Sequence, residues 1–312
     1  MNSYKKLLIC FLFYPVLLFL AIPVIAQPSQ GASLDENNKA LRILVIGNSF
    51  SENATSYLPQ LAEEGGHQIS IQKAQIGGGS LKMHWDALSI AESNPDNPKG
   101  KPYRGKSLKM LLMMGEYDFI SLQQVSTQSA YPESYYPYVE DLYNYVIKYQ
   151  PKAKILIHQI WPYRTDSKNF SKTAANAYAK SSKEMWEKSR AAYHQVAGRF
   201  NARIIPSGDA FHVINSSKRW AFVPDANFNF KNPEYPKLPN QDHSLNIGYY
   251  WDKDKNLKFD SNHANLAGCY LGALVWYSTL FNESPRKLKF SPTEISGEFA
   301  RQLRKVAWKV AK

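Results

Sequence analysis

A serine, a histidine and an aspartate, three residue types that cooperate in nucleophilic catalysis, occur in this chain at telling positions. Ser49 follows the apolar run at 43–46, and a helical pattern begins soon after it. A buried strand that turns sharply into a helix places its turn residues at the carboxyl edge of a sheet, where open α/β proteins keep their chemistry. Ser49 is therefore a candidate nucleophile, although this stretch alone favours a helix cap.

The base must come from one of seven histidines. Five of them occupy positions typical of packing or surface roles: His67, His84, His158, His194 and His212. The other two have an acidic neighbour, since His243 follows Asp242 directly and His263 follows Asp260 by three positions. Adjacent side chains diverge, whereas a one-turn offset lets a carboxylate reach the imidazole Nδ1. Asp260 and His263 are the better pair, and no metal or cofactor is predicted because no metal-binding spacing occurs.

Strand-like and helix-like segments alternate along the chain. We expect strands at 42–46, 68–75, 117–123, 153–160 and 203–206, and helices at 57–64, 80–90, 138–149, 173–200, 264–280 and 295–310. Continuous apolar strands joined by helices indicate a mainly parallel sheet that is covered on both faces. The predicted fold is a three-layer α/β/α sandwich with about five strands. Residues 216–258 are aromatic and poorly periodic, so we interpret them as a long functional loop.

The ordered motifs resemble the SGNH (GDSL-type) hydrolase superfamily, over residues 41–282. They are G-N-S at 47–49, I-G-G-G-S-L at 76–81, Y-D-F-I-S-L-Q-Q-V-S at 117–126 and D-S-N-H-A-N-L-A-G at 260–268. More closely, they resemble a secreted subfamily that was first catalogued as a domain of unknown function and that includes carbohydrate esterases. The resemblance implies Ser49 as nucleophile, His263 as base and Asp260 as acid.

The resemblance also implies an oxyanion hole. Its backbone donor falls in the glycine turn, with Gly78 and Gly79 as the best matches, because N–H groups without side chains can approach an oxyanion closely. The superfamily's asparagine block is replaced here, so we assign the third donor to the amide of Gln123. Gln124 is the reserve, since alternation on a strand sends only one of the two into the cleft. The superfamily's acidic residue before the serine is Asn48 here.

The N-terminus has the pattern of a secretory signal peptide. Lys5 and Lys6 precede an apolar run, and small residues end at Ala26. We therefore expect a signal peptide at 1–26, a linker at 27–40, one hydrolase domain at 41–312, and a secreted or periplasmic protein without a stable membrane anchor. Only Cys269 follows the expected cleavage site, which excludes an intrachain disulfide in the processed chain.

Charge and aromatic content indicate the kind of partner. The net charge is +12, but the basic residues are scattered, so nucleic acid is not an expected partner. Aromatic faces stack on sugar rings, and the end of the fourth strand offers Gln159 and Trp161 as substrate contacts, together with Gln124. The predicted activity is the removal of acetyl or methyl esters from a polysaccharide such as pectin or a hemicellulose. A lipase or thioesterase of the same fold and a non-catalytic carbohydrate-binding protein are the alternatives. The sequence does not indicate an oligomeric state.

Overall fold

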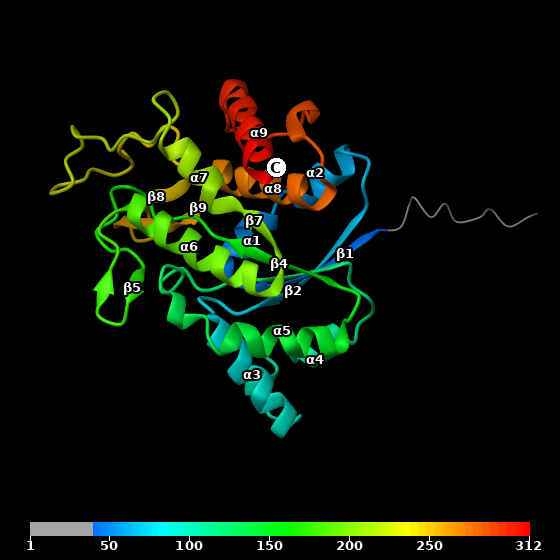
Figure 1. The fold of residues 1–312 in the computed structure, drawn as a ribbon. Helices are drawn as coiled ribbons and strands as arrows, with labels where there is room; N and C mark the ends of the chain where they lie inside the picture. Colours follow the sequence, from blue (N-terminus) through cyan, green and yellow to red (C-terminus); the bar gives the residue numbers. More distant parts are fainter. Residues whose placement is uncertain (1–39) are drawn as a thin grey trace, which may run out of the picture. The chain divides into compact units, whose positions relative to one another are not determined.

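A five-stranded parallel sheet forms the centre of the computed structural model, which describes residues 40–312 (Figure 1). The strand order is β2-β1-β3-β4-β7, and every neighbouring pair is parallel. The strands are β1 (Leu41–Gly47), β2 (Ile69–Gln75), β3 (Phe119–Leu122), β4 (Lys154–Gln159) and β7 (Arg203–Pro206). The predicted mainly parallel sheet of about five strands is confirmed. The predicted signal peptide and the linker up to residue 39 lie outside the described residues.

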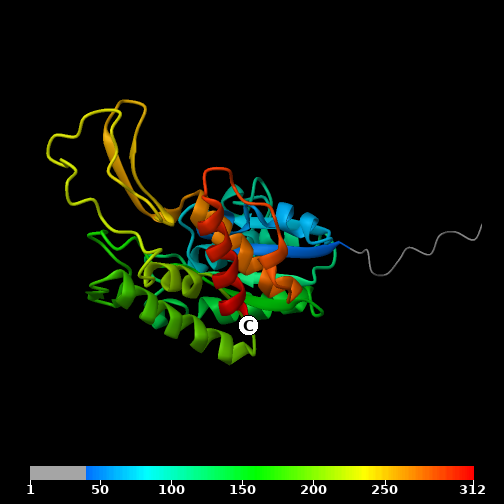
Figure 2. The same cartoon turned by 90° about the horizontal axis from the view of Figure 1, so that it is seen from above.

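Helices cover both faces of the sheet, as Figures 1 and 2 show. The helices are α1 (Ser49–Thr55), α2 (Leu58–Glu64), α3 (Leu81–Ser93), α4 (Leu108–Leu112), α5 (Tyr138–Tyr149), α6 (Ser182–Phe200), α7 (Ser207–Asn215), α8 (Leu266–Phe281) and α9 (Gly297–Ala311). Helices α3 and α5 pack together below the sheet in Figure 1, whereas α8 lies above it against α1, α2, α7 and α9. The central strand β1 is accordingly buried, and residues 43–46 have no exposed surface.

Helix α8 is the most completely buried helix segment near the site. Its residues from Ala267 to Leu280 are all buried, in agreement with its almost uninterrupted apolar sequence. Asn265 caps the helix by accepting a hydrogen bond from the N–H of Gly268, 3.0 Å away. The cap fixes where the chain leaves β9 and enters the core, directly after the predicted base His263. No helix among residues 40–312 is both long and apolar enough to cross a membrane.

Several segments differ from the sequence-based prediction. The predicted helix at 57–64 corresponds to α2, whereas α1 and α4 lie outside the predicted helices. The predicted helix at 173–200 begins only at Ser182. A small antiparallel pair, β5 (Lys172–Ala174) and β6 (Ala177–Tyr178), precedes it. Ser181 accepts a hydrogen bond from the N–H of Glu184, and this cap sets the start of α6.

The most important difference is a hairpin within the predicted loop. Residues 246–264 form the antiparallel strands β8 (Asn246–Trp251) and β9 (Leu257–Ala264), which extend away from the parallel sheet (Figure 2). The base of the hairpin is anchored by Arg164, whose side chain is 2 % exposed and whose N–H donates to the carbonyl of Ser261 at 2.8 Å. The interpretation of 216–258 as one irregular loop is therefore wrong for its last third.

Candidate active site

Three predicted site residues, Ser49, His263 and Asp260, form one hydrogen-bonded chain. The Oγ atom of Ser49 lies 2.9 Å from Nε2 of His263, and Nδ1 of the same ring lies 2.8 Å from Oδ2 of Asp260. With Nδ1–H donating to the carboxylate, Nε2 is left to accept the proton of the serine hydroxyl. The fold thus joins groups that are 214 residues apart along the chain.

A bulge at the end of β9 brings the histidine and the aspartate together. Residues three apart on a regular strand point to opposite faces of the sheet. The pairing register shifts between residues 246 and 248, so that residues 261–263 of β9 lie opposite a single residue of β8. Within the bulge, Oδ1 of Asp260 accepts hydrogen bonds from the N–H groups of Asn262 and His263, at 3.1 and 3.0 Å. The expected one-turn offset is therefore produced by a bulged strand.

The two ionisable groups shift each other's pKa. Burial alone raises the pKa of the Asp260 carboxyl, but hydrogen bonds from the side chain and backbone of His263 outweigh it, and the pKa lies below its ordinary value. The hydrogen bond that His263 donates to Asp260 raises the pKa of His263 above its ordinary 6.5, although burial opposes this rise. The His263 side chain remains 34 % exposed. Solvent can therefore reach this ring.

Ser49 is the first residue of α1, directly after the end of β1. Asn48 caps this helix by accepting a hydrogen bond from the N–H of Phe50 at 3.0 Å, so Ser49 is not the helix cap that this stretch alone favours. The first residue of a helix has no intrahelical acceptor for its own N–H. No described residue accepts a hydrogen bond from the Ser49 N–H, which leaves this group available to a ligand.

The side chain of Asn48 connects the ends of three neighbouring strands. Its Nδ2 donates to the carbonyl of Gly79 after β2 at 2.9 Å, and its Oδ1 accepts from Nε2 of Gln123 after β3 at 3.0 Å. The second hydrogen of the Gln123 amide is donated to the carbonyl of Gln124. Gln123 is also only 1 % exposed. Because both amide hydrogens are used inside the protein, the assignment of Gln123 as an oxyanion donor is corrected to a structural role.

The glycine turn at 77–79 retains one free donor of the two predicted. The N–H of Gly79 donates to the carbonyl of Ile76 at 2.8 Å, which removes it as an oxyanion donor. The N–H of Gly78 has no acceptor among the described residues. Gly78 has a φ of +62° and is exposed, a conformation that glycine adopts without strain. Of the two predicted glycines, Gly78 is therefore the one able to offer an N–H to a ligand, and the N–H of the exposed Gly77 is likewise without an acceptor among the described residues.

A buried polar network lies beneath Ser49, and the sequence did not predict it. The hydroxyl of Ser51 donates to Oε1 of Gln123 at 2.6 Å and lies 3.4 Å from Nδ1 of His158. The other nitrogen of that ring lies 3.1 Å from the hydroxyl of Ser207. Burial lowers the pKa of His158 to about 3, so the ring is neutral. A Cβ on Gly47 would stand 2.5 Å from Oγ of Ser51, which explains the glycine.

The three predicted substrate contacts are buried. Trp161, Gln159 and Gln124 have no exposed surface. Nε1 of Trp161 donates to the carbonyl of Asn262 at 2.9 Å, so this side chain supports the bulge from behind. Gln159 donates to the carboxylate of Asp209 at 2.7 Å. The prediction that these side chains touch substrate is therefore wrong, because each faces the interior.

Gln124 is held on both ends of its amide. Its Oε1 accepts hydrogen bonds from the N–H groups of Leu81 and Val125, at 3.1 and 2.9 Å. Its Nε2 donates to the carbonyl of Ser134 at 2.9 Å. These bonds tie the start of α3 to the end of β3, so Gln124 has a structural role.

The competing pair Asp242 and His243 lies elsewhere. The ring of His243 packs between Trp220 and Phe299, with ring centroids 5.0 Å from each, and takes no part in the hydrogen bonds of Ser49. Among residues 40–312, no group of three or more histidine, cysteine, aspartate or glutamate side chains is placed to hold a metal ion. The chemistry available at this edge of the sheet is nucleophilic attack by a serine.

Comparisons with solved structures agree with this architecture. A DUF4886 family protein from Bacteroides uniformis aligns with a TM-score of 0.66 and 22% identity, over 87% of this chain and 95% of that protein. A protein from Slackia heliotrinireducens with a provisional description as an SGNH hydrolase aligns over 78% of this chain and 100% of its own, with a TM-score of 0.48 and 22% identity. The acetyl xylan esterase AlAXEase aligns with a TM-score of 0.45 and 12% identity, over 77% of this chain and 100% of its own.

Sequence comparison places the chain in a family. No curated protein sequence matches it. The model of the family described as a domain of unknown function (DUF4886) matches residues 42–230, which is more than half of the chain and contains Ser49 and the glycine turn. The matched region ends before the hairpin that carries Asp260 and His263. The chain belongs to the DUF4886 family.

Proposed function

We propose that this protein is a serine esterase that removes acetyl or methyl ester groups from a polysaccharide. The observation that carries the proposal is the hydrogen-bonded chain from Ser49 through His263 to Asp260. In it, His263 takes the proton of Ser49 as the serine oxygen attacks the ester carbonyl, and Asp260 stabilises the imidazolium that forms. The N–H groups of Ser49 and Gly78 are the proposed oxyanion donors.

The reaction then proceeds through an acyl-enzyme. The tetrahedral intermediate collapses, and His263 returns the proton to the leaving alcohol. Water, deprotonated by the same imidazole, attacks the acyl group and releases the acid. An acetylated sugar would leave as the alcohol and its acetate as the acid. A methyl-esterified uronate would release methanol first and the uronate second.

A polymeric sugar substrate is supported by the aromatic hairpin. The described part of the hairpin and of the preceding loop exposes several aromatic side chains, among them Phe230, Tyr235 and Tyr250 at 45%, 55% and 42%. Aromatic rings present an apolar face to the C–H surface of a sugar. We further propose, as the sequence indicates, that the protein acts outside the cytoplasm, where such polymers occur.

The Ser49→Ala substitution tests the mechanism. We expect hydrolysis of p-nitrophenyl acetate to fall by about 10⁴-fold or more, because the nucleophile is removed. The matched control is Ser56→Ala, an exposed serine just after the same helix, which should retain activity. A folded Ser49→Ala protein with wild-type turnover would refute the serine mechanism.

A second assay separates the alternatives. The wild-type protein is incubated with methyl-esterified pectin and with acetylated xylan, and methanol and acetate are measured separately. Release of either product supports the carbohydrate esterase. A rate that rises steeply with acyl length on synthetic esters would identify a lipase or thioesterase instead. Polysaccharide binding without ester turnover would identify a binding protein.

A further inference from the structure

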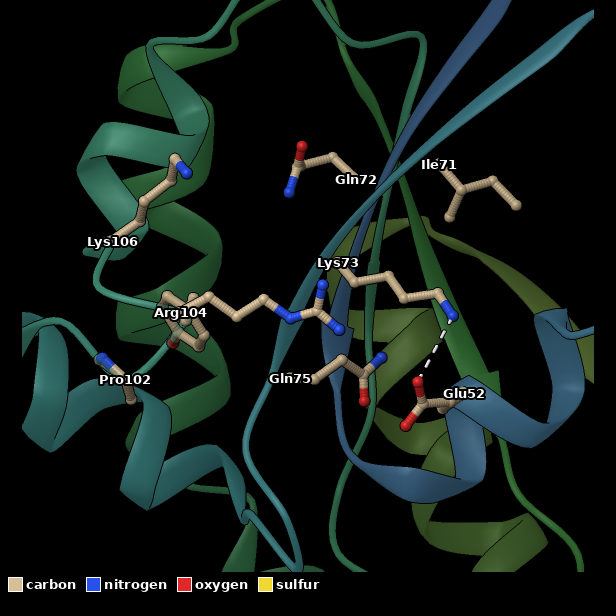
Figure 3. Close-up of a pocket in the computed structure, with 9 residues that line it drawn as sticks. Glu52, Ile71, Gln72, Lys73, Gln75, Pro102, Arg104 and Lys106 are labelled. Carbon is tan, nitrogen blue, oxygen red and sulfur yellow. Dashed lines mark ion pairs between the residues drawn. The ribbon is translucent and has the colours of Figure 1, made fainter.

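A cavity of about 430 Å³ lies along the edge strand β2. Its walls are the outer residues of β2, Glu52 of α1 and the loop at 102–106, as Figure 3 shows. The strand is at the edge of the sheet, and no strand among residues 40–312 pairs with its free side. The volume is within the range of ligand pockets.

The lining of the cavity is strongly basic. Lys73, Arg104 and Lys106 face it together with a single carboxylate, that of Glu52. Lys73 and Glu52 form a loose ion pair of 3.7 Å between partly exposed side chains. Arg104 and Lys106 have no carboxylate partner among the described residues. Three cations and one anion leave an excess of two positive charges, which favours an anionic ligand.

An amide without partners lies in the same cavity. Both polar atoms of the Gln75 side chain are buried, and neither has a hydrogen-bond partner in the described part of the chain. Figure 3 shows this amide between the guanidinium of Arg104 and the carboxylate of Glu52. Buried amide groups are nearly always hydrogen-bonded, so this amide is free to bond a ligand or a water molecule. The amide is able both to donate and to accept.

Three features connect the cavity to the segment that carries Ser49, although Ser49 itself does not line the cavity. Gln75 stands opposite Gly47 in the sheet register. Glu52 follows Ser49 by one helical turn of α1. The hydroxyl of Tyr103, in the cavity wall, bonds Nδ1 of His84 at 2.8 Å. The cavity is therefore built on the same strand end as the site.

The wall behind the cavity is held by a neutral histidine. Nε2 of His84 lies 3.1 Å from the carbonyl of Gly47, so this nitrogen is the donor and Nδ1 accepts from Tyr103. Burial lowers the pKa of His84 to about 4. His84 therefore carries no charge at neutral pH. Lys73, Arg104 and Lys106 dominate the electrostatics of the cavity.

We propose that this cavity binds a carboxylate of the substrate, the uronate group of a sugar next to the ester that Ser49 attacks. The inference rests on the esterase function proposed above. The planar guanidinium of Arg104 matches the two oxygens of a carboxylate. Lys106 adds a second charge, and the Gln75 amide supplies a hydrogen bond to the carboxylate or to a sugar hydroxyl. The selected substrate is thus an acidic polysaccharide.

Calorimetry on the inactive Ser49→Ala protein tests the subsite without turnover. A trimer of galacturonic acid should bind, whereas neutral maltotriose should bind at least about tenfold more weakly. Arg104→Gln and Lys106→Gln, each added to Ser49→Ala, should each weaken binding of the acidic trimer by about tenfold. Lys99→Gln is the control, since this exposed lysine has the same charge and lies outside the cavity.

Two further binding measurements, one at rising salt concentration and one with inorganic sulfate, test whether the contact is ionic and specific for a carboxylate. Binding of the acidic trimer should weaken as the salt concentration rises, because the contact is ionic. Equal affinity for the acidic and neutral trimers would overturn the subsite, as would unchanged binding in both cavity variants. Binding of inorganic sulfate without binding of the uronate trimer would overturn the carboxylate assignment.

The proposed subsite and the proposed esterase function can be refuted independently of each other. A wild-type protein that binds the acidic trimer but hydrolyses no ester would refute the proposed enzyme alone. An active esterase that does not discriminate acidic from neutral trimers would refute the subsite alone. In an active enzyme, the ratio of kcat/KM on pectin to kcat/KM on acetylated xylan should also fall in Arg104→Gln, which a purely structural role would not produce.

Discussion

Asn48, the residue before the proposed nucleophile, shows what one side chain contributes to this site. The superfamily that the chain resembles has an acidic residue here. A carboxylate would accept the hydrogen bonds that Asn48 receives from Phe50 and Gln123. It has no hydrogen to donate to the carbonyl of Gly79, as the Nδ2 of Asn48 does at 2.9 Å. In this chain the asparagine therefore holds the glycine turn and the helix start in one arrangement.

The raised pKa of His263 determines how activity depends on pH. Only the neutral imidazole accepts the proton of Ser49, so kcat/KM rises with pH through the pKa of His263 in the free enzyme. Because Asp260 raises this pKa, half-maximal activity is expected above pH 6.5. The measurement is kcat/KM on p-nitrophenyl acetate between about pH 5 and pH 9.

Asp260→Asn is the companion variant for the pH profile. Its loss of the carboxylate should lower kcat by about 10⁴-fold, because the imidazole is no longer held in the productive tautomer. Circular dichroism across the pH range excludes unfolding as the cause of the acid limb. A wild-type half-point below pH 6.5 would contradict the raised pKa.

At the scale of elements, the hairpin is what the sequence did not predict. Its strands alternate weakly between buried and exposed residues, since β8 and β9 pair only with each other. Gln123 was misassigned for a related reason. Strand β3 ends at Leu122, so the alternation used to place the two glutamines no longer applies, and both are buried.

The support of the bulge by Trp161 is testable at this scale. Trp161→Phe removes the donor to the carbonyl of Asn262 and keeps an aromatic ring against Phe50 and Phe211, whose centroids are 4.7 and 4.6 Å away. We expect the free energy of unfolding to fall by about 1–3 kcal/mol. Displacement of His263 should lower kcat by about tenfold to a hundredfold.

Urea unfolding and steady-state kinetics measure the two effects of Trp161→Phe. Trp308→Phe, a half-buried tryptophan on α9, serves as the matched control. A variant with reduced stability but wild-type kcat would show that the hydrogen bond supports the fold without positioning the base.

At the scale of the whole molecule, the sheet and the helices were predictable because their patterns are local. Residues 43–46 form an apolar run that only a doubly covered strand buries, and α8 is apolar around its whole circumference. The pairing of Asp260 with His263 was predicted from a one-turn offset, but it depends on the bulge in β9, which the spacing does not indicate. The burial of Trp161 and the network through Ser51 and His158 were not predictable, because they depend on contacts between segments about 100 residues apart.

Cys269 offers a measure of how cooperatively this core opens. The thiol lies in α8, is 8% exposed, and has a pKa that burial raises to about 11. We expect its alkylation near pH 7.5 to be at least about a hundredfold slower in the native protein than in denaturant, since the thiolate is the reactive form. Mass spectrometry of the peptide containing Cys269 gives the rate. Comparable rates in both states would mean that α8 opens locally.

The bulged hairpin keeps the proposed catalytic residues at one end and its exposed turn at the other. Asp260 and His263 lie at its root, where Trp161 and Arg164 hold residues 261–262, whereas residues 252–256 form the turn at its far end. A tip of different length or sequence would leave the spacing of Asp260 and His263 unaltered, because the register shift that sets this spacing lies at the root of the hairpin. If the proposed esterase function holds, the tip can therefore be exchanged to test polymer binding without disturbing the proposed reaction.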